Sequence, residues 1–201
     1  NWLAGDQVLQ QLIHSIDKGA WAMQDEPPVK AWGMGGRAAC FGPSFGDLFD
    51  HQAVVYEYAN GVRMFGLCRN HINCHNELTD TIFGTKGVAR LIKHQIEIGG
   101  ETKWRYDGPK CNMYDAEHQE LFASIRSGKP INNGKYMVGT TMLALLGQMV
   151  CHTGKQLTWE QAMESQASVE LDRYGFDVEP PIKPNAKGDY DIAVPGITKF
   201  A

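Results

Sequence analysis

The sequence has 201 residues, of which 43% are hydrophobic and 21% charged, a balance typical of a globular chain that buries its own core. The net charge is −4 and no block of Lys and Arg stands out, which argues against a nucleic-acid partner and against a polybasic membrane patch. No apolar run is long enough to span a membrane, and no signal peptide is visible. Five cysteines, an odd number, predict reduced and mostly buried thiols rather than a disulfide scaffold.

The first predicted element is a helix from Asp6 to Met23, in which Asp6 is the expected N-cap and the prolines after Glu26 end the helix. Its apolar residues recur at helical spacing: Val8, Leu9, Leu12, Ile13 and Ile16.

Strand signals follow over 29–39, 50–58 and 62–69, then over 78–83, 88–94 and 103–106. Asn60-Gly61 between two strand-like runs predicts a β-hairpin, and Gly84 to Gly87 predicts a second turn. Because short turns and no helices separate these runs, the sequence predicts an antiparallel meander.

Helices are expected again over 115–127 and 134–152, and a short one starts at Thr158, where Thr158 and Gln161 fit a capping box. The fold class is therefore α+β: an open, mainly antiparallel sheet with helices on one face. The first hairpin carries apolar residues on both faces, so we expect a homo-oligomer in which a partner subunit covers the second face. Residues 1–172 form the expected domain, and 173–201 form an extended Pro-rich tail.

A stripe of polar side chains follows one side of the first helix at spacings of three and four: Gln7, Gln10, His14, Asp17 and Trp21. His14 is the natural acid or base of this stripe because imidazole titrates near neutral pH, and Asp17 would orient it or stabilise its charge. On spacing alone, a solvated helix face is the simpler explanation of the stripe.

Two further groups carry reactive side chains. The segment 69–77 contains His71, Cys74, His75 and Glu77, but it lacks the spacing of a zinc site, and a polar loop is the simpler interpretation. Asp47 with Asp50-His51 is the weakest signal, because an Asp beside a His is common. Gly33 to Arg37 is glycine-rich, yet no helix follows to receive a phosphate. We therefore predict no metal and no cofactor bound by this chain alone.

Several stretches in order resemble the C-terminal domain of the glucose–fructose oxidoreductase / inositol dehydrogenase (Gfo/Idh/MocA) family, in a bacterial branch of carbohydrate degraders. The resemblance covers nearly the whole chain and rests on five segments: Gly5 to Trp21, Asp50 to Arg63, Phe83 to Gly87, Ile125 to Pro130 and Thr153 to Trp159.

The resemblance implies a parent enzyme whose separate Rossmann domain binds NAD or NADP, while this domain lines a sugar or cyclitol site and packs sheet to sheet in an oligomer. His14 matches the catalytic His of the family. Asp17 matches an Asp that contacts the substrate or supports this His. Gln10 stands where the family usually has an acid. Gln10, Trp21, His75 and Arg69 are the expected substrate-binding residues.

Three alternatives stay open. The domain could be a stand-alone oligomeric sugar-binding module, part of a redox-assisted glycoside hydrolase or lyase, or a metal-assisted variant that uses His14 with His71 or His75. The chain begins Asn1-Trp2-Leu3 without Met, which suggests a piece of a longer protein. The compartment stays open between bacterial cytoplasm and periplasm.

Overall fold

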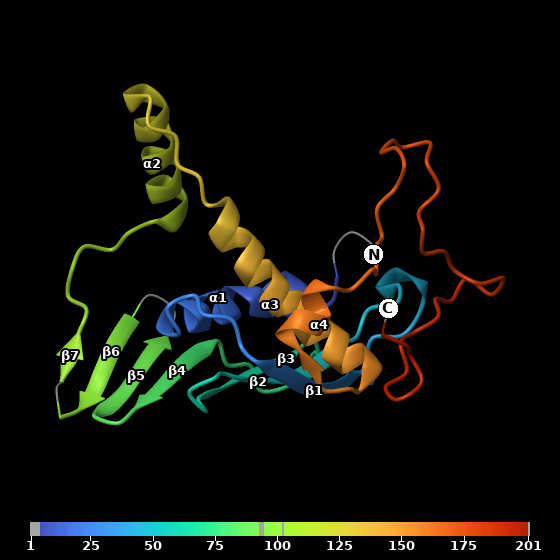
Figure 1. Ribbon diagram of the computed structural model, residues 1–201, viewed down its shortest axis with the longest axis horizontal. Coiled ribbons are helices and arrows are strands. Elements are labelled where there is room, and N and C mark those ends of the chain that lie inside the picture. The colour runs from blue at the N-terminus through green and yellow to red at the C-terminus, as the bar shows by residue number, and fades with distance from the viewer. Residues whose placement is uncertain (1–4, 93–94, 102, 201) are drawn as a thin grey trace. The chain divides into compact units, whose positions relative to one another are not determined.

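The computed structural model describes residues 5–92, 95–101 and 103–200, which form two compact units. One unit combines the chain up to Asn73 with the chain from Tyr136 onward, and the other is Cys74–Lys135. Both contain an antiparallel sheet and helices, so the α+β prediction is confirmed (Figure 1).

The sheet of the first unit has the strand order β3-β2-β1-β8. Its strands are β1 (Lys30–Gly36), β2 (His51–Glu57), β3 (Arg63–Arg69) and β8 (Leu157–Thr158), all paired antiparallel. The predicted hairpin is confirmed: β2 and β3 pair from Glu57↔Arg63, and the Tyr58 N–H donates to the Val62 carbonyl at 2.9 Å to close the turn. Strand β8, which the sequence analysis did not predict, pairs with the start of β1.

The helices of this unit are α1 (Ile13–Ala22), α3 (Gly134–Thr153) and α4 (Trp159–Met163). The helix expected from Asp6 to Met23 opens with a π-helical turn, η1 (Val8–Leu12), and continues as α1. Asp6 is not the side-chain N-cap that was predicted. Only its backbone carbonyl receives the N–H groups of Leu9 and Gln10, because its carboxylate is held by α3. The capping box at Thr158 and Gln161 is confirmed.

Alternate residues of β2 point to the helices, and these are the buried ones: Gln52, Val54 and Tyr56. Helix α3 approaches this face closely, because a Cβ on Gly147 would lie 2.4 Å from the Tyr56 hydroxyl. That hydroxyl donates to the Leu143 carbonyl of α3 at 3.0 Å and so ties strand to helix. A Cβ on Gly33 would likewise meet the Cys151 sulfur at 2.9 Å.

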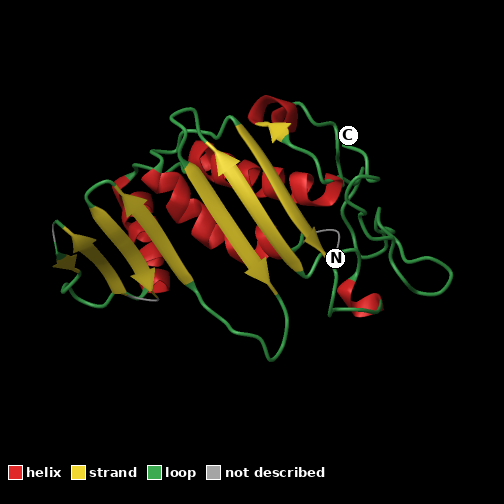
Figure 2. Cartoon of the chain, turned by 90° about the horizontal axis from the view of Figure 1, so that it is seen from below, coloured by secondary structure: helices red, strands yellow, loops and turns green. Residues whose placement is uncertain are grey.

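The helices of the first unit cover one face of its sheet and leave the other face uncovered (Figure 2). This uncovered face carries exposed apolar side chains. Met34, Phe65 and Leu67 are 72%, 65% and 72% exposed, and they alternate with the residues that face the helices. The structure therefore has the second apolar face that the hairpin pattern predicted.

The second unit contains the sheet β4-β5-β6-β7 and helix α2 (Met113–Ser127). The strands are β4 (Thr79–Gly84), β5 (Gly87–Ile92), β6 (Gln95–Gly100) and β7 (Trp104–Arg105), paired in chain order. The meander is confirmed, although β6 was not predicted and the last two residues expected for the preceding strand, 93–94, lie outside the described residues.

After α4 the described chain runs to residue 200 without a further helix or strand. Ile192, Ala193 and Phe200 pack against the core of the first unit, and the Gly196 N–H donates to the Thr153 carbonyl at 2.8 Å. A 3-10 turn, η2 (Pro43–Phe45), precedes β2.

All five cysteines are free, but only Cys151 is buried, while Cys74 and Cys111 are exposed. The expectation of mostly buried thiols was therefore wrong. Within the described residues, no helix is both long and apolar enough to cross a membrane.

Candidate functional site

The polar stripe of the first helix meets α3. His14 and Trp21 are exposed, the Trp21 indole at 61%, and Asp17 lies half-buried between them in sequence. A regular α-helix runs from Ile13, so these three residues keep the spacing that the sequence predicted.

Asp17 is the best-connected member of the stripe. Its Oδ1 accepts a hydrogen bond from the Tyr136 hydroxyl and a second one, at 2.9 Å, from the Thr140 hydroxyl. The Trp21 Nε1–H donates to the same Tyr136 hydroxyl at 2.8 Å, and the two rings lie 6.3 Å apart between centroids. The structure therefore joins α1 to α3 through a carboxylate, two hydroxyls and an indole.

Sequence analysis missed Tyr136 and Thr140. They are four residues apart, one turn of α3, so they occupy one side of that helix. A helical Tyr and Thr at this spacing carry two hydroxyls on one side, which is the signal that could have found them.

The pKa of Tyr136 is raised to about 12, first by burial and then by its hydrogen bond to the Asp17 carboxylate. The phenol therefore keeps its proton at neutral pH and acts as a donor. No hydrogen bond between His14 and Asp17 is found in the described part of the chain, so the prediction that Asp17 orients His14 stays a prediction.

Gln10 lies on the π-helical turn and is exposed. The α-helical spacing used in the sequence analysis holds only from Ile13 onward, because a π-turn advances fewer degrees per residue. Turns of this kind occur often at functional sites, and this one lies at the start of the helix that carries His14.

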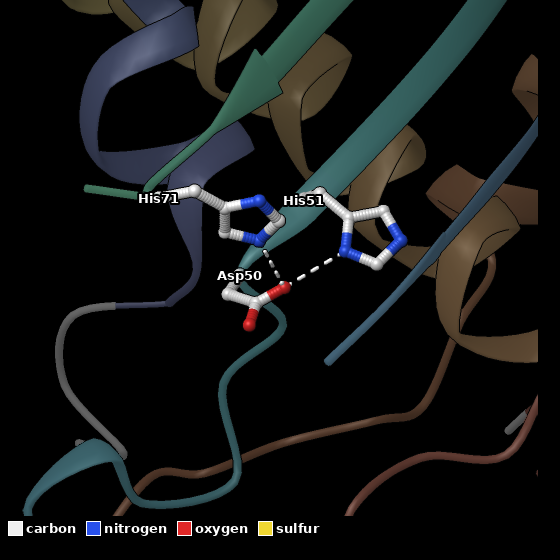
Figure 3. A group of neighbouring side chains, drawn as sticks. All are labelled: Asp50, His51 and His71. Atoms are coloured by element: carbon white, nitrogen blue, oxygen red, sulfur yellow. Dashed lines mark hydrogen bonds and ion pairs between the residues drawn. The ribbon is translucent and has the colours of Figure 1, made fainter. Parts of the chain in front are cut away.

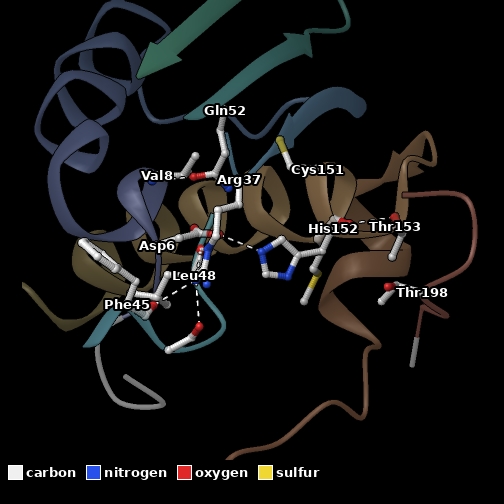
Figure 4. A network of polar contacts seen from close by, with 12 residues as sticks. Asp6, Val8, Arg37, Phe45, Leu48, Gln52, Cys151, His152, Thr153 and Thr198 are labelled. Carbon is white, nitrogen blue, oxygen red and sulfur yellow. Dashed lines mark hydrogen bonds and ion pairs between the residues drawn. The ribbon is translucent and has the colours of Figure 1, made fainter. Parts of the chain in front are cut away.

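A second pair fixes the beginning of this helix (Figure 4). The Asp6 carboxylate, with no exposed surface, lies with Oδ2 2.7 Å from Nε2 of His152 near the end of α3. His152 also packs its ring against Phe49 at 4.5 Å between centroids. On β2, the Gln52 Oε1 accepts a hydrogen bond from the Val8 N–H at 3.2 Å. These contacts position η1 and α1 against α3 and the sheet.

The other two predicted substrate-binding residues belong to other parts of the chain. Arg69 is the last residue of β3, paired in register with His51. His75 belongs to the second unit, exposed, with Nε2 3.3 Å from Glu77 Oε2. A separate group in the first unit, Asp50, His51 and His71, could hold a metal ion (Figure 3).

The glycine-rich run of the sequence is not a phosphate-binding loop. The glycine-rich run Gly33 to Gly36 is part of β1, and the space beside Gly33 is filled by the side chains of Val150 and Cys151. A phosphate-binding loop instead presents free backbone N–H groups at a helix N-terminus.

No protein-family model matches the sequence. No curated protein matches it either. Solved oxidoreductase structures do share its fold. UDP-N-acetylglucosamine 3-dehydrogenase GnnA from Acidithiobacillus ferrooxidans superposes with a TM-score of 0.60 at 17% identity, over 73% of this chain and 47% of that one. Aldose-aldose oxidoreductase from Caulobacter crescentus, complexed with glycerol, superposes with a TM-score of 0.57 at 15% identity, over 73% of this chain and 45% of that one.

The WlbA dehydrogenase from Bordetella pertussis, in complex with NADH and UDP-GlcNAcA, gives a TM-score of 0.55 at 15% identity, over 77% of this chain and 45% of that one. This chain thus spans about half the length of the structures it matches. At these identities the likeness establishes the fold: an α+β architecture found within sugar and NAD-dependent oxidoreductases.

Proposed function

We propose that this chain is the substrate-binding and oligomerisation domain of an NAD(P)-dependent sugar or cyclitol oxidoreductase of the glucose–fructose oxidoreductase type. The observation that carries the proposal is the polar group on α1 and α3 beside the exposed Trp21 indole. The half-length match to sugar-nucleotide and aldose oxidoreductases supports it. We expect the nucleotide to bind to polypeptide outside this chain, because the glycine-rich run of β1 is not a phosphate-binding loop.

The chemistry of the group suits a polyol. A carboxylate accepts hydrogen bonds from sugar hydroxyls, and protein hydroxyls both donate to them and accept from them. An indole face packs against the apolar C–H face of a sugar ring. His14, exposed on the same helix, takes the proton that leaves a hydroxyl when its carbon becomes a carbonyl. Gln10 holds a hydroxyl as an amide and cannot act as a base. His75 and Arg69 stay expected contacts of the substrate.

Two measurements test the substrate role. The chain is titrated with UDP-N-acetylglucosamine, D-glucose and myo-inositol by ligand-observed NMR, and with NADH by fluorescence. We expect saturable binding of at least one polyol, weakened about tenfold or more in Trp21→Ala and Asp17→Ala, and no saturable binding of NADH. The control is His118→Ala, a change of an exposed histidine on α2.

The complete protein then separates the enzyme from a stand-alone sugar-binding module. With the bound polyol and NAD or NADP, reduction of the nucleotide is followed at 340 nm. The enzyme proposal expects turnover that His14→Ala abolishes while polyol binding persists. Polyol binding without turnover in the complete protein would favour the binding module, and unchanged turnover in His14→Ala would refute the proton-transfer role.

We propose further that the open face of the first sheet is the contact between subunits. The middle of this face carries the exposed side chains of Met34, Phe65 and Leu67. At one end of the face, the Glu57 carboxylate forms ion pairs with Lys30 at 3.0 Å and with Arg63 at 2.7 Å. An exposed apolar patch framed by charges is typical of a protein interface.

Sedimentation velocity tests this assembly. We expect wild type to sediment as an oligomer, and Phe65→Asp, which places a charge in the middle of the face, to sediment as a monomer. Val169→Asp, at an exposed apolar residue after α4, is the matched control and should leave the oligomer intact. A monomeric wild type would refute the proposal.

A further inference from the structure

Three metal-capable side chains converge where β2 begins and β3 ends. Because the two strands are antiparallel, the start of one lies beside the end of the other. The Asn70 N–H donates to the Asp50 carbonyl at 2.8 Å, and the Asp50 N–H donates to the Gly36 carbonyl at 2.9 Å. Asp50 and His51 therefore stand in a fixed position against His71, two residues beyond β3.

One carboxylate oxygen is shared by both imidazoles (Figure 3). Asp50 Oδ1 lies 2.8 Å from His51 Nδ1 and 3.0 Å from His71 Nε2. These three atoms all lie within 4.8 Å of one another, and the two rings meet edge to face with centroids 5.7 Å apart. The three atoms are thus close enough together to serve as ligands of a single ion.

Of the three side chains, His71 has the poorest hydrogen bonding. Its Nε2 is buried and, despite the short distance to Asp50, makes no well-aligned hydrogen bond in the described part of the chain. A buried ring nitrogen without an aligned partner is unfavourable unless something else binds its lone pair. An ion between the three atoms would do so.

The other oxygen of Asp50 is held rigidly by the backbone. Oδ2 accepts from the N–H groups of Ala38, Ala39 and Cys40 at 2.9, 2.8 and 2.9 Å. Burial alone would raise the pKa of Asp50, but the two neighbouring imidazoles and these backbone N–H groups together hold it well below its usual range. The group is therefore an oriented carboxylate, the state that a metal ligand requires.

We propose that Asp50 Oδ1, His51 Nδ1 and His71 Nε2 bind one divalent transition-metal ion of the zinc class. Two imidazoles and one carboxylate are a ligand set that Zn²⁺ and Fe²⁺ use in open sites, where further positions are left for water or a substrate oxygen. His51 is 42% exposed, so solvent reaches this side of the site. Gly36, which pairs with His51 across the strands, has no side chain, and even a Cβ there would lie 3.6 Å from the His51 ring. Gly36 therefore does not crowd the imidazole.

The competing explanation is an ordinary hydrogen-bonded network in which both imidazoles donate to Asp50. A metal site should bind an added divalent ion tightly, whereas a hydrogen-bonded network should not. The test titrates Zn²⁺ into the chain by calorimetry and Co²⁺ by visible absorption, with Cys74→Ser and Cys111→Ser as background to remove the two exposed thiols.

We expect one ion per chain with micromolar affinity. His51→Gln and His71→Gln, which keep side-chain size, should each weaken binding by on the order of 100-fold. The control is His118→Gln, an exposed histidine on α2 whose Nδ1 lies 2.7 Å from the Tyr114 carbonyl. Far-UV circular dichroism checks that each variant folds.

Two results would overturn the proposal: no binding of Zn²⁺ below about 1 mM, or binding that both glutamine variants retain at control strength. If a glutamine variant fails to fold, the Co²⁺ spectrum of the background protein decides. Absorption without imidazole-ligated bands, or no spectrum at all, would rule out this site. The inference does not depend on the proposed oxidoreductase role, since the readout is binding of the ion alone.

Discussion

Loss of the His152 imidazole should destabilise the chain strongly, because it leaves the Asp6 carboxylate buried and alone. Asp6 has no exposed side-chain surface, its Oδ2 is 2.7 Å from His152 Nε2, and its Oδ1 is buried without a hydrogen-bond partner among the described residues. Removing one partner of such a buried pair costs about 3–5 kcal/mol. A domain is stable by about 5–15 kcal/mol in total, so His152→Ala should remove at least about a fifth of that free energy of unfolding.

The assays are urea unfolding and thermal unfolding of a double-mutant cycle, both followed by circular dichroism. His152→Ala should lower the thermal midpoint by roughly 6 to 20 °C, at about 2–4 °C per kcal/mol for a chain of this size. Asp6→Asn, which removes the charge and keeps the shape, should cost about 1–2 kcal/mol. The double variant should cost clearly less than the sum, because the uncompensated charge is then gone.

An exposed ion pair is the control. Arg173 and Asp177 form a pair on the surface, 64% and 72% exposed, and Arg173→Ala should leave the midpoint nearly unchanged. A cost of less than about 1 kcal/mol for His152→Ala, or strictly additive costs in the cycle, would refute the idea that this pair anchors the helix start.

Three further changes follow from single contacts. Gly147→Ala should destabilise by about 1–3 kcal/mol in urea unfolding, because its Cβ would lie 2.4 Å from the Tyr56 hydroxyl, and adding Tyr56→Phe should recover part of the loss. Thr158→Ala should cost about 1 kcal/mol through the lost cap of α4, measured by the same unfolding. The folded pKa of Asp50 is lowered, so its stabilisation is complete above an unfolded pKa near 3.8 and is lost as pH falls toward the folded value; Asp50→Asn should flatten this acid-side slope in unfolding at pH 2–5. A slope equal to that of wild type would contradict this assignment.

Most elements of the fold could be predicted because their signals are local. The Asn60-Gly61 turn, the Gly84 to Gly87 turn and the Thr158 capping box each depend on a few neighbouring residues, and all three occur as expected. The α+β class followed from strands joined by short turns.

The elements that sequence analysis missed depend on distant partners. Strand β8 has two residues and exists because it pairs with β1, more than a hundred residues away. Strand β6 did carry a local signal, the alternation of Ile96 and Ile98 with polar residues, which was overlooked beside the following glycines. The predicted N-cap at Asp6 failed for the same non-local reason, since His152 of α3 takes its carboxylate.

The site was predictable only along one helix. Helical spacing placed His14, Asp17 and Trp21 together, but nothing in the spacing could bring Tyr136 and Thr140 to Asp17 from a helix far along the chain. The group at Asp50, His51 and His71 is similar: sequence analysis treated its members as two weak signals, and the antiparallel pairing of β2 and β3 joins them.

The stripe divides into a rigid part and a free part, and that division bears on its chemistry. Asp17 is held by two hydroxyls from α3, and Trp21 is fixed through Tyr136, so these side chains are already ordered before a ligand arrives. Preordered groups bind with less loss of conformational entropy, which suits them to orienting a substrate. His14 is exposed on the same helix and makes no hydrogen bond to Asp17 among the described residues, and the Oδ2 of Asp17 is not used by the α3 hydroxyls. A proton acceptor must find its orientation from a neighbour. If His14 has the proposed role, we expect a bound substrate or a neighbouring polypeptide to orient its imidazole, so that its reactivity depends on the assembled, substrate-bound protein.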